Sequence, residues 1–152
     1  MATPTVDDAA GPGPTLGVLL FIPYRHMEQR ILDAVVAAGH PITLAQARLF
    51  QRVDPRGSRL TTLAAAAQTT KQAAKFLVDQ LESGGYVERV PDPADGRARL
   101  VSITGRGHDV ITIATAVQQG IEREWASHLG ERSTEELRRT LRRLREITDP
   151  FA

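Results

Sequence analysis

One stretch of the chain holds residue types that bond phosphates and base edges. Residues 69–76 read TTKQAAKF, and apolar residues at positions 74, 77, 78 and 81 predict a helix with one face in a core. The other face would present side chains that bond phosphate oxygens, bond adenine edges or contact thymine methyl groups: Thr70, Lys71, Gln72, Ala73 and Lys75. For this stretch alone, the alternative interpretation is a polar face that only contacts water.

A second cluster of such residues follows in a segment that alternates apolar and polar. Residues 86–90 and 100–103 predict a β-hairpin, with a long charged tip over 91–99. Asp95, Arg97 and Arg99 are spaced two apart, so they share one face of a strand. An aspartate can hold a guanidinium by paired hydrogen bonds, and a positioned arginine suits a narrow minor groove. The alternative is a surface ion pair that only stiffens the hairpin.

The composition excludes several other chemistries. There is no cysteine, which excludes disulfides, thiolate catalysis and cysteine-based zinc sites. The histidines, at positions 26, 40, 108 and 128, are never three or four residues apart, so we expect no helical metal site and no cofactor. The sequence shows no nucleophile–base pair or carboxylate pair, so we do not expect an enzyme.

Length and charge limit the remaining classes. The chain has 152 residues, 41% of them hydrophobic and 24% charged, which is typical of one soluble globular domain. Its 19 basic and 18 acidic residues exclude a polybasic protein that coats nucleic acid by charge alone. Residues 52–106, however, carry nine basic and six acidic residues, a local charge of +3. No signal peptide or membrane span is evident, so we expect a cytoplasmic protein without a membrane partner.

Helical periodicity predicts the elements that would position the two clusters. We expect a disordered tail over 1–14, because its Pro, Gly and small residues cannot bury much surface. The first expected helix covers 16–38, and Pro23 should kink or restart it. The others cover 43–53 with Thr43 as N-cap, 60–67, 69 or 70 to 83 with a Thr69–Gln72 capping box, 107–129, and a last helix capped by Ser133 or Thr134. The fold class is therefore mainly α with a small β-wing, that is, a winged helix-turn-helix flanked by N- and C-terminal helices.

The run from Gly85 to Gly107, GYVERVPDPADGRARLVSITGRG, resembles the wing signature of the MarR family of transcriptional regulators. That signature is a D-x-R core followed by L-x-L-T-x-x-G, and the resemblance is sharp over residues 58–107. It implies a single domain over 15–152, with a winged helix-turn-helix at 43–106 and dimerisation helices at 15–42 and 107–152. It also implies a homodimer on a near-palindromic operator in double-stranded DNA, usually a repressor, released by a small, often aromatic or anionic, effector.

The resemblance also implies roles for individual residues. Lys71, Gln72, Ala73 and Lys75 would face the major groove, Arg97 would be the minor-groove arginine of the wing, and Asp95 would orient it. The ligand-site positions would be Tyr24, Arg25, Met27, Arg30, Phe50 and Arg52. Phe76 departs from the family, which commonly has a polar or basic residue there, and we expect it to pack under the wing.

Two features favour dimerisation independently, namely the apolar segment 16–22 and the apolar stripe of the last helix. Trp125 is either an interface anchor or a core residue. Two other functions stay open: a winged-helix protein-interaction module that does not bind DNA, and an architectural protein that binds DNA without sequence preference.

Overall fold

The computed structural model describes residues 13–151, which form six α-helices and a two-stranded antiparallel sheet. Residues 1–12 of the expected tail lie outside the described residues. The elements are α1 (Leu16–Ala37), α2 (Leu44–Phe50), α3 (Leu60–Ala66), α4 (Lys71–Ser83), β1 (Val87–Asp92), β2 (Asp95–Ile103), α5 (Gly105–Leu129) and α6 (Glu131–Thr148). The expected fold class, mainly α with a β-wing, is confirmed.

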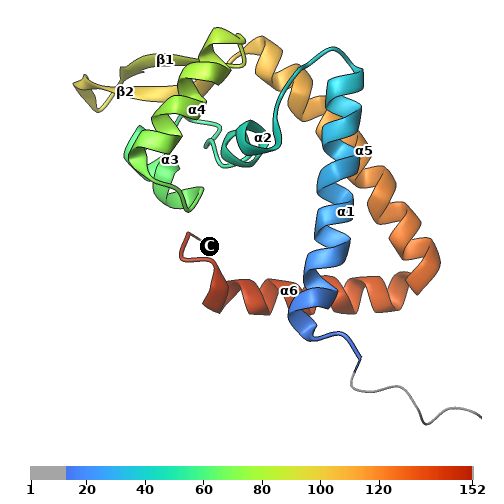
Figure 1. The fold of residues 1–152 in the computed structure, drawn as a ribbon. Helices are drawn as coiled ribbons and strands as arrows, with labels where there is room; N and C mark the ends of the chain where they lie inside the picture. The colour runs from blue at the N-terminus through green and yellow to red at the C-terminus, as the bar shows by residue number, and fades with distance from the viewer. Residues whose placement is uncertain (1–12, 152) are drawn as a thin grey trace, which may run out of the picture.

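Figure 1 shows two parts of different shape. Helices α2, α3 and α4 form one group with the hairpin projecting from it, while α1 and α5 are long arms that cross where they pack on each other and then diverge. Helix α6 turns back from the end of α5. No helix among residues 13–151 is long and apolar enough to cross a membrane.

Threonine caps begin four of the helices, α1, α2, α4 and α5. Thr43 Oγ1 accepts from the Gln46 amide at 3.2 Å, and the Gln46 side chain accepts from the Thr43 amide at 2.9 Å, which completes a capping box on α2. Thr70 caps α4 by accepting from the Ala73 amide at 3.1 Å. The expected Thr69–Gln72 box is therefore wrong, because α4 begins one residue later and alanine stands at its third position.

Two expected helix boundaries are also wrong. Helix α1 runs unbroken through Pro23, and water can bond the carbonyl that the proline leaves free, because the preceding turn, including Leu19, is exposed. Helix α6 begins at Glu131, after Gly130 with φ +85°. Thr134 therefore lies inside the helix and donates its hydroxyl to the Gly130 carbonyl at 2.9 Å instead of capping it.

The hairpin has longer strands and a shorter tip than expected. Its turn is only Pro93–Ala94, with an irregular register at Pro91 and Asp92, so residues 95–99 lie on β2 and not in a loop. On its other side β2 pairs with the loop before α3, where Ser58 and Val101 exchange backbone hydrogen bonds of 3.0 and 2.8 Å. These backbone hydrogen bonds hold the hairpin against the helical part, in addition to its chain connections to α4 and α5.

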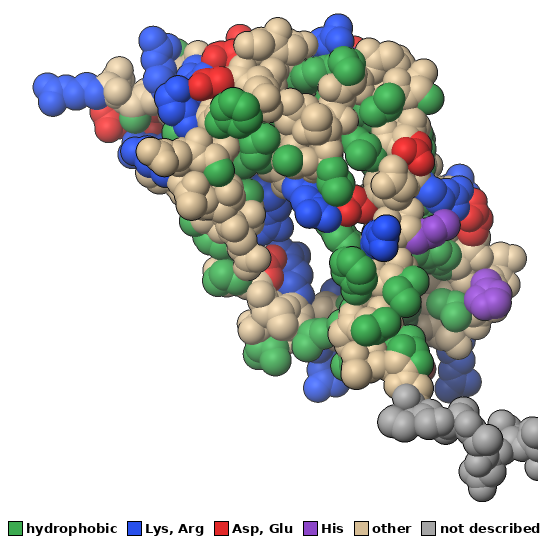
Figure 2. Space-filling view, in the orientation of Figure 1, with side chains coloured by type: hydrophobic (Ala, Val, Ile, Leu, Met, Phe, Trp, Pro, Cys, Tyr) green, Lys and Arg blue, Asp and Glu red, His purple; other side chains and the backbone are tan. Residues whose placement is uncertain are grey.

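The core lies under α2, α3, α4 and the hairpin. Leu49, Leu63, Val78, Leu81 and Val87 are among its fully buried side chains. The arms are different: Val35 is the only buried residue of α1, and α6 has none among the described residues. Figure 2 shows hydrophobic side chains on the surface where α1 begins and α6 runs.

Candidate functional site

The exposed face of α4 presents the residues expected there. Ala74, Val78 and Leu81 fix the buried face, and Thr70, Lys71, Gln72 and Lys75 are exposed on the rest of the helix, while Ala73 is half-buried. Phe76 is 63% exposed. The expectation that Phe76 packs under the wing is therefore wrong, since it points away from the core on α4.

Arg89 of β1 fixes the hairpin against α4. Its guanidinium donates to Asp79 at 2.6 Å and also to Glu82, and its backbone N–H donates to Glu82 at 3.1 Å. Lys75 donates to the same Asp79 at 2.7 Å. The hydrogen bonds from Lys75 and then from Arg89 lower the pKa of Asp79. Because Asp79 partly neutralises the charge of Lys75, this lysine attracts a phosphate less strongly than an unpaired lysine would.

Arg59, just before α3, holds the tip of the hairpin. It donates two hydrogen bonds to Asp92, at 2.6 and 2.9 Å, and Asp92 is 8% exposed. The Ala94 backbone N–H also donates to Asp92, and this bond, followed by those from Arg59, lowers the pKa of the carboxyl. Sequence reasoning missed Arg59 and Arg89, because each bonds a residue on a different element and no local spacing marks them.

Asp95, Arg97 and Arg99 are all exposed on β2, on the part of the hairpin that projects from the molecule. Asp95 accepts from the Arg97 backbone N–H at 3.1 Å, and its carboxylate lies 3.7 Å from Arg59. Within residues 13–151 no hydrogen bond joins Asp95 to the Arg97 guanidinium, so the expected orienting pair is wrong as drawn from the sequence. The short turn brings Asp95 beside Asp92, where Arg59 already is.

Three cations of this surface have no acidic partner in the described part of the chain: Lys71, Arg97 and Arg99. Figure 2 shows Lys and Arg side chains projecting at the hairpin end of the molecule, at the upper left. Unpaired cations on a helix face and an adjacent hairpin can bond successive phosphates of a duplex.

A cavity of about 500 Å³ lies between α1, α2 and α5. Tyr24, Met27 and Phe50, three of the six expected ligand-site residues, line it. The other three do not: Arg25 is exposed, Arg30 donates to Glu124 at 2.5 and 2.8 Å, and Arg52 lines a neighbouring hollow 3.7 Å from Asp149. These three arginines therefore lie outside this cavity, because helical spacing does not show which face of α1 meets α5.

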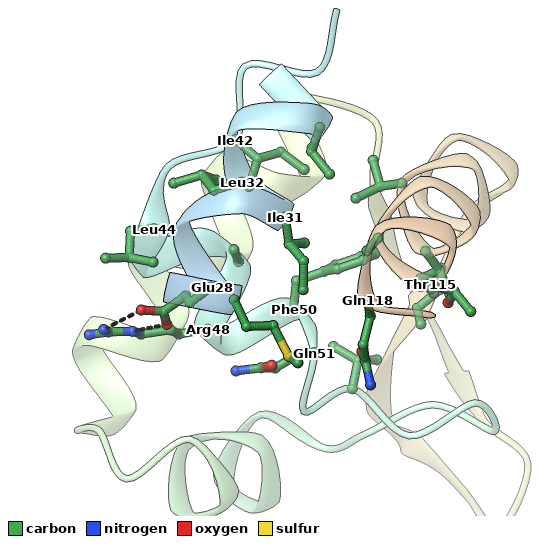
Figure 3. Close-up of a pocket in the computed structure, with 18 of the residues that line it drawn as sticks. Glu28, Ile31, Leu32, Ile42, Leu44, Arg48, Phe50, Gln51, Thr115 and Gln118 are labelled. Atoms are coloured by element: carbon green, nitrogen blue, oxygen red, sulfur yellow. Dashed lines mark hydrogen bonds and ion pairs between the residues drawn. The ribbon is translucent and has the colours of Figure 1, made fainter. Parts of the chain in front are cut away.

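The cavity lining is apolar apart from a few groups near its edge. Figure 3 shows Glu28 and Arg48 paired on one side of the cavity, Gln118 of α5 on the other, and Gln51 between them. Arg48 donates to both Glu28 oxygens, at 2.7 and 2.9 Å, and Tyr24 donates to Glu28 at 3.2 Å. The hydrogen bond from Arg48 is the main reason that the pKa of Glu28 is lowered. The two full charges of the lining therefore neutralise each other.

Known proteins resemble this chain in sequence over part of its length. A sequence model of the MarR family matches residues 40–98. Transcriptional regulator HosA of Escherichia coli O111:H- is 28% identical over 91 residues, which are 60% of this chain and 67% of HosA. The same regulator of E. coli O127:H6 is 32% identical over 83 residues, and this match spans 59% of that protein's length.

Solved structures share the fold over most of the chain. A crystal structure of MarR is 26% identical with a TM-score of 0.69, and the match covers 86% of this chain and 95% of MarR. CouR from Rhodococcus jostii RHA1, crystallised with p-coumaroyl-CoA, matches with a TM-score of 0.68 over 90% of this chain and 94% of CouR. At 22% identity, the likeness to CouR shows the fold alone. The helices, the attached hairpin and these matches agree: residues 40–98 match the MarR family of transcriptional regulators, and the fold around them is that of MarR.

Proposed function

We propose that the protein is a sequence-specific DNA-binding regulator that acts as a homodimer on a near-palindromic operator and represses transcription. The observation that carries the proposal is the group of unpaired cations, Lys71, Arg97 and Arg99, on α4 and the hairpin. Arg89 and Arg59 hold the hairpin at a set position relative to α3 and α4. A recognition helix and a wing held in this way suit a major groove and the backbone or minor groove beside it.

The exposed apolar residues of the two arms support the homodimer. Leu16, Phe21 and Ile22 of α1 are 70%, 56% and 57% exposed, and Leu137 and Leu141 of α6 are 43% and 39% exposed. Patches of this kind on separate monomers are costly in water and mark interaction sites. In a two-fold dimer the same patches meet in pairs, and two copies of α4 would reach half-sites one helical turn of DNA apart.

The cavity supports release by a small molecule. Its volume of about 500 Å³ suits an aromatic compound, and it lies between α5, an arm, and α2, which packs on α4. A ligand there would weaken DNA binding if it favoured an arrangement of arms and α4 that does not match the operator. Because Glu28 neutralises Arg48, we propose an uncharged aromatic ligand and not an anionic one.

A DNA titration tests the main proposal. The purified chain is titrated against the DNA upstream of its coding region, with random duplex as competitor, at two salt concentrations. We expect specific binding of one dimer per near-palindrome that weakens as salt rises, because phosphate contacts release counterions. Lys71→Ala should weaken binding on every duplex, whereas Arg142→Ala, which removes a charge from exposed α6, should not.

Other results would favour the alternatives. Equal affinity for all duplexes would indicate an architectural DNA-binding protein. Binding to none, in a protein that folds and dimerises, would indicate a protein-interaction module.

A further inference from the structure

Phe76 is the only large hydrophobic side chain that the winged part, residues 43–106, exposes widely to solvent. It is 63% exposed, and the other exposed large hydrophobics among residues 13–151 lie on α1, α5 and α6 or at Phe151. A single exposed hydrophobic residue is common on protein surfaces. What distinguishes Phe76 is therefore its position on α4 and not its exposure.

Phe76 lies in the middle of the face that α4 turns away from the core. It follows Gln72 by four positions, so the two side chains lie in one row along the helix. Four residues of helix rise about 6 Å, which is close to two base-pair steps of about 3.4 Å. A helix that places Gln72 against one base pair thus brings Phe76 to a base pair about two steps away.

The charges beside Phe76 are already neutralised. Lys75 and Asp79 of the next row are paired at 2.7 Å, and Asp79 also accepts from Arg89 at 2.6 Å. The middle of this face is therefore apolar and close to neutral, unlike its start at Lys71. A phenyl ring offers nothing to a phosphate, and the apolar group that a base pair shows in the major groove is the C5-methyl of thymine.

We infer that Phe76 contacts the methyl group of one thymine in each half-site and is a specificity-determining residue of the interface. The inference rests on the proposed function. Contact with the ring would remove one methyl-sized group from water, which corresponds to about fourfold in affinity for one half-site and about fifteenfold for two. We therefore expect an operator with a thymine about two base pairs from the position that depends on Gln72.

Replacement of thymine by deoxyuracil tests this inference, because it removes only the methyl group. The full chain is titrated against the tightest duplex selected from a random pool, in which each thymine is replaced in turn. The wild-type protein should lose about fourfold in affinity at one thymine per half-site. Phe76→Ala changes both half-sites, so it should bind the thymine duplex about fifteenfold more weakly, as the wild type binds a duplex with both of these thymines replaced, and it should not respond to the replacement.

Two further variants control for indirect effects. Phe76→Leu keeps an apolar side chain and should keep part of the response to deoxyuracil. Val36→Ala removes a 47% exposed side chain from α1 and should change neither the affinity nor the response. Thermal unfolding should be nearly the same for all variants, because neither residue is in the core.

The outcomes separate this inference from the proposed function. A wild-type protein that responds to no replacement, or a Phe76→Ala variant that keeps the full response, would overturn the inference while specific DNA binding stands. A protein that binds no duplex would overturn both.

Discussion

The pairing of Glu28 with Arg48 leads to a prediction about the charge of the ligand. In the wild type a ligand carboxylate would meet an arginine that already bonds both oxygens of Glu28, at 2.7 and 2.9 Å. Glu28→Gln removes the negative charge and leaves Arg48 at the edge of the cavity with no charged partner. We expect the variant to shift its preference from an uncharged aromatic ligand toward an anionic one of the same shape.

The size of this shift follows from the exposure of the pair. A hydrogen bond to a charged group contributes about 1.5–3 kcal/mol where water is limited. The Arg48 side chain is 54% exposed, although that of Glu28 is only 14% exposed. The lower end of that range is therefore appropriate, about 1.5 kcal/mol, which is roughly tenfold in a dissociation constant.

Two naphthalene derivatives of nearly equal shape provide the assay. The dissociation constants of 2-naphthamide and 2-naphthoate are measured by calorimetry at pH 7.5 for the wild type and Glu28→Gln. The wild type should prefer the amide, and Glu28→Gln should move the ratio of the two constants about tenfold toward the carboxylate.

Glu124→Gln provides the matched control. It breaks another arginine pair made by α1, with Arg30 at 2.5 and 2.8 Å, but neither Arg30 nor Glu124 lines the cavity. The ratio should therefore stay as in the wild type. A ratio that Glu28→Gln leaves unchanged, or that Glu124→Gln changes as much, would refute the reasoning, as would a wild type that prefers the carboxylate.

Four other predictions concern DNA binding, assembly and acid stability. Arg97→Ala should weaken binding to every duplex and make the dependence of log K on log salt less steep by about 0.9 for each arginine on a phosphate, whereas an unchanged slope would exclude a phosphate contact. Gln72→Ala should relax the base preference at one position of each half-site and weaken binding to the preferred base by about 1–3 kcal/mol. If selection of duplexes by the variant recovers the same base at that position, Gln72 does not read a base. Phe21→Asp should give a folded monomer in analytical ultracentrifugation, because Phe21 is 56% exposed on the arm; a dimer of unchanged strength would place the interface elsewhere. A backbone N–H and then Arg59 lower the pKa of Asp92 in the folded state. The carboxylate therefore stabilises the fold at a pH above its unfolded pKa of about 3.8, and this stabilisation is lost as the pH falls through the lower folded pKa. In urea unfolding from pH 6 to 2, Asp92→Asn should show a smaller loss of stability than the wild type.

Local signals in the sequence predicted most of the elements. Thr43 and Gln46 stand at the spacing of a helix start, and Gly84 follows the last turn of α4, so the boundaries there depend on neighbours in the chain. The wing signature from Gly85 to Gly107 placed the hairpin between α4 and α5. The candidate residues of α4 were also found in this way, because a helix with one buried face necessarily exposes the other.

The errors arose where distant residues decide the structure. The sequence predicted a long loop at the tip of the hairpin. In the structure Arg59, thirty-three residues before Asp92 in the chain, donates to the Asp92 carboxylate at the end of β1. Arg30 reads as a ligand-site cation, yet Glu124 of α5 takes up its guanidinium, ninety-four residues away in the chain. Periodicity shows that a residue lies on a helix, whereas its partner depends on how the helices pack, which single-sequence patterns do not contain.

The first turns of α5 connect the cavity to the winged part. Thr104 caps α5, and its hydroxyl donates to the Gly85 carbonyl at 2.5 Å, in the segment between α4 and β1. A Cβ at Gly107 would lie 2.3 Å from the Tyr86 carbonyl and 3.2 Å from the Phe50 ring, so the helix meets this segment with no space for a side chain. Phe50 also lines the cavity. Because the backbone contact at Gly107 leaves no free space, a ligand that displaces the start of α5 must displace Tyr86, and with it the end of α4. A ligand changes the affinity for DNA only as far as it binds two such arrangements with different affinity.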